Sequence, residues 1–61
     1  MSTPPQTGDI VRELCGGRHA RTARVVEVLP SSLRMIDLTT GEPIDDDPEW
    51  WTVVVSPIRL R

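Results

Sequence analysis

Only a few residue groups in this chain have the types and spacing needed for chemistry. Cys15 and His19 lie four residues apart and are the only cysteine and the only histidine. A thiol beside an imidazole can act as a nucleophile with its base, but catalysis also needs an orienting group and a cleft. A chain of 61 residues has little room for a cleft. We therefore predict no catalytic residues, no enzymatic activity and no cofactor.

An acidic run, Asp45-Asp46-Asp47, precedes Pro48 and Glu49 and is the only pattern that suggests a metal. Calcium loops alternate their oxygen ligands along the chain and use a glycine and a distant bidentate carboxylate. Consecutive aspartates before a proline lack that spacing, and no cysteine or cysteine–histidine pair has zinc spacing. We predict a solvated acidic loop and no metal site.

The basic residues are concentrated in one half of the chain. Residues 12–34 contain five arginines, one histidine and two acids, whereas residues 37–49 contain six acids and no basic residue. Guanidinium groups on a glycine-containing loop can follow a phosphate backbone. Two alternatives to nucleic-acid binding stay open. The loop could be solvated and pair with the acidic half of the same molecule, and the use of arginine without lysine could reflect codon bias. The residues predicted to bind nucleic acid are Arg18, His19, Arg21 and Arg24.

The adjacent Trp50 and Trp51 are the only aromatic residues. Neighbours on a strand point to opposite faces, so we expect Trp51 in the core, in phase with Val53 and Val55. An exposed Trp50 could stack on a base or anchor a protein partner, or it could lie flat on its own domain. The residues predicted for protein interaction are Trp50, Asp45, Asp46, Asp47 and Glu49.

Turn signals divide the chain into short strands that must position these groups. The Pro-rich residues 1–7 predict a flexible, disordered arm, and residues 8–61 predict one domain. We expect strands at 9–14, 22–29, 33–38, 50–55 and 58–60, without helical periodicity. Two prolines make 43–49 an expected exposed loop that cannot be a central strand. The predicted fold class is all-β, a small five-stranded barrel.

Hydrophobic side chains of opposite parity in the second predicted strand indicate an irregularity. A bulge or strong bend would let Val25, Val26 and Val28 all find cover. Gly41 is expected to take a positive φ in the turn that follows the third strand. The predicted core residues are Val11, Val25, Val28, Ile36, Leu38, Trp51, Val53, Val55 and Ile58.

Residues 8–38 resemble the KOW motif and its SH3-like barrel relatives. The resemblance rests on Gly8-Asp9-Ile10-Val11-Arg12, on the run from Gly16 to Pro30, and on the run from Leu33 to Leu38. In that family a strand is followed by a glycine-containing basic loop and two antiparallel strands. Ala23 stands where the KOW pattern typically has glycine. The resemblance implies an SH3-like barrel whose loop contacts RNA or protein.

Composition limits where the protein works. The longest apolar run, Val53–Val55, is far from the roughly 20 residues that span a bilayer. The N-terminal residues lack a signal-peptide pattern, and one unpaired cysteine fits a reducing compartment. We expect a cytoplasmic protein without membrane contact. A thin core and complementary charge halves favour a homo-oligomer.

Two function classes remain from the sequence. One is a small non-catalytic binding module that contacts nucleic acid, RNA or DNA, or a nucleoprotein machine through the Arg-rich loop. The alternative is a protein-interaction adaptor, or a small phage or mobile-element structural or regulatory protein, that uses Trp50 and the acidic residues 42–49. The net charge of −2 favours the alternative, and the family resemblance favours the first.

Overall fold

A computed structural model describes residues 4–56 of the chain. Its five strands are β1 (Ile10–Glu13), β2 (Thr22–Val28), β3 (Leu33–Asp37), β4 (Pro43–Asp46) and β5 (Trp51–Val55). All of them pair antiparallel in one sheet. Two short 3₁₀ turns, η1 (Gly17–His19) and η2 (Pro48–Trp50), lie between strands, and the described residues contain no α-helix. The all-β prediction with five strands is confirmed.

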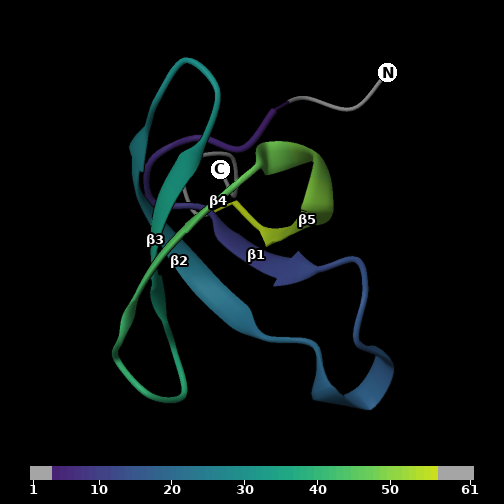
Figure 1. The fold of residues 1–61 in the computed structure, drawn as a ribbon. Helices are drawn as coiled ribbons and strands as arrows, with labels where there is room; N and C mark the ends of the chain where they lie inside the picture. Colours follow the sequence, from purple (N-terminus) through teal and green to yellow (C-terminus); the bar gives the residue numbers. More distant parts are fainter. Residues whose placement is uncertain (1–3, 57–61) are drawn as a thin grey trace.

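The strand order, β4-β3-β2-β1-β5, makes β4 and β5 the two edges of the sheet. Yet only residues 47–50 connect these edges, as Figure 1 shows in green. In a flat sheet the edges would be about 19 Å apart, four strand spacings of ~4.8 Å. A four-residue connection containing a 3₁₀ turn, which rises only ~2 Å per residue, is too short for that distance. The sheet therefore curls until its edges approach each other.

The strand β4 corrects the prediction of an exposed loop over residues 43–49. β4 pairs with β3, and Ile44 is buried opposite Met35. A proline is tolerated at the start of an edge strand, where its missing N–H breaks no central ladder. The rule that excludes proline from central strands therefore does not exclude this strand. The strand expected at 58–60 lies outside the described residues.

One face of the sheet holds the core, and the strand registers decide which residues belong to it. Val11, Val25 and Trp51 are buried as predicted, and Val53 is half-buried against them. The remaining buried hydrophobic side chains, which the prediction missed, are those of Ala23, Leu33, Met35 and Ile44. Ala23 is fully buried between its cross-strand neighbours Val11 and Asp37.

The other predicted core residues lie elsewhere. Leu33, Met35 and Asp37 occupy the inward positions of β3, so Ile36 points outward and is only half-buried. A register shift between Val25 and Glu27 confirms the expected bulge. The bulge nevertheless leaves Val26 and Val28 exposed, although Val28 pairs with the buried Leu33. Four side chains predicted to be buried are in fact 41–49% exposed, those of Val26, Val28, Leu38 and Val55. Ile58 lies outside the described residues.

A buried carboxylate joins the two ends of the described chain. Asp9 is fully buried, accepts the Gln6 backbone N–H at Oδ2 (2.9 Å) and accepts the Ser56 hydroxyl at Oδ1 (2.8 Å). Pro5, within the segment predicted as an arm, is buried as well. Residues 1–3 of that segment lie outside the described residues.

Candidate nucleic-acid interface

The β1–β2 connection presents two of the predicted basic residues to solvent. Gly16 has φ of 103°, and a Cβ there would lie 3.2 Å from the Cα of Ala20, so the tight loop requires glycine. The following turn η1 carries Arg18 and His19, both exposed. Arg12 on β1 donates from Nη2 to the carbonyl oxygen of Gly17 (3.2 Å), which ties the turn to the sheet.

Arg21, at the end of the same connection, is held by the protein itself. Its Nε and Nη2 donate to Glu13 Oε1 (3.1 Å) and Oε2 (2.9 Å), and its backbone N–H donates to Oε1 (2.7 Å). The guanidinium carbon also lies 5.6 Å from the ring centroid of Trp51. Hydrogen bonds from Arg21 lower the pKa of Glu13, and the same contacts raise the pKa of Arg21. This arginine is therefore much less available to a ligand than Arg18.

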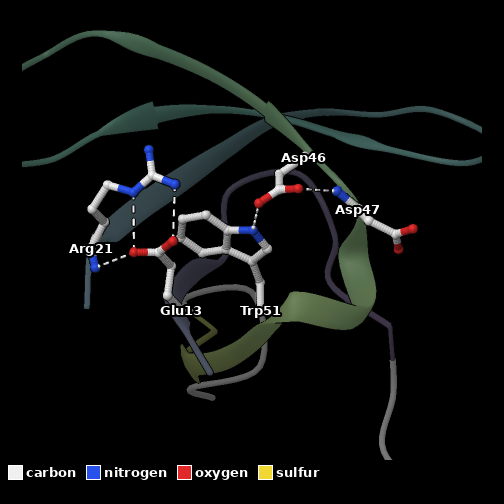
Figure 2. Close-up of polar contacts among 5 residues, drawn as sticks. All are labelled: Glu13, Arg21, Asp46, Asp47 and Trp51. Carbon is white, nitrogen blue, oxygen red and sulfur yellow. Dashed lines mark hydrogen bonds and ion pairs between the residues drawn. The ribbon is translucent and has the colours of Figure 1, made fainter. Parts of the chain in front are cut away.

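The indole of Trp51 lies between that ion pair and the acidic segment (Figure 2). Its Nε1–H donates to Asp46 Oδ2 (3.0 Å), and the second oxygen of Asp46 accepts the Asp47 N–H (2.8 Å). Asp47 in turn accepts the Glu49 N–H (3.1 Å) at the start of η2. These carboxylates hold the short connection between the two sheet edges. We call Glu13, Arg21, Asp46 and Trp51 the indole cluster.

The residues predicted for protein interaction therefore separate into two sets. Asp45 pairs with Arg34 (3.5 Å), which also pairs with Glu27 (3.0 Å). Asp46 accepts the indole N–H of Trp51, and Asp47 accepts the backbone N–H of Glu49. Trp50 is 51% exposed and Glu49 is exposed. The prediction that Trp51 points inward and Trp50 outward is confirmed, because Trp51 is 4% exposed.

Arg24 lies in the middle of the outer face of the sheet. Its direct cross-strand neighbours are Ile10 on β1 and Ile36 on β3. Arg12 stands two residues further along β1, opposite Thr22. Diagonal neighbours of this kind are about 7–8 Å apart in antiparallel sheets. Arg34 continues the diagonal on β3 in the other direction, although it is paired with acids.

The diagonal contains two arginines that sequence reasoning did not select, Arg12 and Arg34. Both belong to the basic half of the sequence. Alternation along β1 and β3 would have placed their side chains on the face of the sheet opposite the core. Their position beside Arg24 depends on the cross-strand register, which no local pattern specifies. We call Arg12, Arg18, His19 and Arg24 the basic surface, since no ion pair to any of them is found within residues 4–56.

Other kinds of site find little support in the described residues. Among residues 4–56 no three His, Cys, Asp or Glu side chains are grouped so that they could hold a metal ion. Cys15 is an exposed free thiol. The same part of the chain has no helix of the length and apolarity needed to cross a membrane. No protein-family model matches the chain, and neither a curated protein nor a solved structure matches it.

Proposed function

We propose that this chain is a small, non-catalytic binding module of the SH3-like, KOW-like class that contacts nucleic acid through the basic surface. The supporting observation is the difference in how the two predicted sites use their charges. Arg18, His19 and Arg24 keep exposed side chains without an acidic partner among the described residues, and Arg12 joins them. Guanidinium groups in such positions can make bidentate contacts with phosphates.

The competing adaptor function loses more of its predicted residues. Three of its five residues are engaged within the fold: Asp45 by Arg34, Asp46 by Trp51, and Asp47 by the start of η2. Only Trp50 and Glu49 remain as a possible docking surface. The net charge of −2 still opposes strong non-specific binding. We therefore propose modest affinity, carried by a local patch of charge.

The expected ligand contact is with the phosphate backbone, so affinity should depend on salt and little on sequence. With three arginines in contact, the log–log slope of affinity against salt should be about −2 to −3, at 0.7–0.9 per phosphate. Fluorescence anisotropy with a labelled RNA strand and a DNA duplex, from 50 to 200 mM salt, measures this slope. Arg24→Ala should reduce its magnitude by about 0.7–0.9.

Arg21→Gln is the matched control, since it removes the same charge from a side chain that Glu13 already neutralises. We expect it to change the slope much less than Arg24→Ala, provided that its circular dichroism spectrum stays native. Equal effects of the two variants would show that only net charge matters. Absence of binding at about 50 mM salt, where screening is mild, would reject the proposal and favour a protein partner at Trp50 and Glu49.

The exposed free thiol of Cys15 supports a further part of the proposal, a reducing cytoplasmic location.

Trp50 adds a second expectation about the ligand. Its ring lies on η2 and is 51% exposed, so it is placed to stack on an unpaired base, whereas the bases of a duplex are already stacked on each other. Trp50→Ala should therefore weaken binding to single strands and leave duplex binding unchanged.

A further inference from the structure

The two edges of the sheet differ in how they are protected against pairing with another strand. The β4 edge carries Pro43, which has no N–H, and the charged Asp45 and Asp46. Proline and charge are the usual means by which an edge strand avoids a partner. The β5 edge, Trp51–Val55, has neither over its whole length, and Val54 and Val55 are 52% and 43% exposed.

The backbone of β5 also has hydrogen-bonding groups that point away from β1. Leu14 N–H donates to the Trp50 carbonyl oxygen (2.9 Å), and bonding groups alternate along an antiparallel strand. Thr52 therefore faces its partner Arg12, and the N–H and C=O of Val53 are directed outward. Within residues 4–56, the backbone of residues 52–55 makes no hydrogen bond outside the pairing with β1.

We propose that the β5 edge binds the β5 edge of a second copy of this chain, in antiparallel register centred on Val53. A strand without charges can meet its own copy without like-charge repulsion. In this register Val53 pairs with itself across a two-fold axis, and Thr52 lies opposite Val54 of the other copy. Both of these side chains are exposed in the single chain. The pairing would join two five-stranded sheets into one continuous sheet.

This mechanism differs from association through the acidic and basic halves. Arg34 and Asp45, one pair that such halves could have formed between copies, are paired within one chain. Main-chain hydrogen bonds between uncharged strands respond weakly to salt, whereas exposed ion pairs are screened. Self-association through β5 should therefore change little between 50 and 500 mM salt, although the screening of exposed charges increases strongly over this range. Self-association through β5 requires no nucleic acid, and binding of nucleic acid is measured in a separate titration.

The decisive measurement is the exchange rate of the Val53 amide proton in the full chain, followed by NMR at several protein concentrations. Protection that grows with concentration, together with a dimeric mass in sedimentation, is the expected result. Protection that is the same at every concentration would mean that residues of the same chain occupy the edge, and it would overturn the proposal. Fast exchange at every concentration, with a monomeric mass, would overturn it as well.

A pair of lysine variants separates edge pairing from association through the outer face. Val54→Lys places a charge on the β5 edge and should weaken self-association by about tenfold or more. Val26→Lys makes the same change at an exposed valine of the central strand β2, and should leave self-association unchanged. If Val26→Lys were the more disruptive, the copies would meet face to face, and edge pairing would be rejected.

Discussion

The indole cluster and the basic surface both contain arginine, but the arginine stabilises the fold in the first and is available to a ligand in the second. Arg21 has a carboxylate as a near neighbour, Glu13, and an aromatic ring beside it, so its charge stabilises the protein's own fold. Arg24 has isoleucines as direct neighbours on both adjacent strands, so its charge has no partner within the sheet. The cross-strand neighbour, and not the residue type, decides whether an arginine is available for a ligand.

The largest loss of stability is expected when the ring at the centre of the indole cluster is removed. Trp51→Ala should cost about 3–5 kcal/mol of unfolding free energy, because it empties the core and removes the support of Arg21. Small domains rarely have more than ~3–5 kcal/mol in total, so this variant should be largely unfolded. Urea denaturation followed by far-UV circular dichroism measures the loss.

Trp50→Ala is the control for that experiment. It deletes the same side chain one position earlier, where the ring is 51% exposed. Surface substitutions of this kind usually change stability by no more than ~0.5 kcal/mol. Similar losses for the two variants would contradict the assignment of Trp51 alone to the core.

An intermediate effect is expected at Asp46, which accepts the indole N–H. Asp46→Ala leaves the Nε1–H of a buried ring without a partner and should cost about 1–3 kcal/mol. Asp45→Ala removes an exposed ion pair on the same strand and should cost about 0–1 kcal/mol. Thermal denaturation of the two variants side by side gives the difference, and a larger loss for Asp45→Ala would refute this order.

The smallest effect concerns the ion pair of the cluster and appears as a pH dependence. Hydrogen bonds from Arg21 lower the pKa of Glu13 in the folded chain. The pair therefore stabilises the fold above the ordinary glutamate pKa of about 4.3. This contribution is lost as the pH falls through the lower folded value. It should be small, because the guanidinium side chain is 46% exposed and screened by water.

Comparison with Glu13→Gln isolates that contribution from other titrating groups. Urea denaturation should show the wild type more stable than the variant at pH 7. The two stabilities should converge once the pH is well below the folded pKa of Glu13. A stability difference that persisted unchanged in acid would show that packing of the side chain matters, and not its charge.

Local patterns predicted much of the fold and less of the candidate site. The β-branched run of β2, the bulge after Val25 and the positive φ of Gly41 were all readable from neighbouring residues. The strand β4 was missed because Pro43 and the aspartates look like a loop, and only its edge position makes them acceptable. Likewise, nothing close to Arg21 in sequence marks Glu13, eight residues earlier, as its partner.

The sequence by itself determined the features of the fold that depend on short-range geometry. Alternation along a strand is enough to send Trp51 inward and Trp50 outward, and the Gly16-Gly17 pair is enough to indicate a break after the first strand. Tertiary structure alone decided that Ile36 faces outward, that Arg12 stands diagonal to Arg24, and that β5 remains an edge without protecting charge. The first two depend on the register between paired strands, where a shift of one residue exchanges the two faces, and the third depends on the strand order of the sheet.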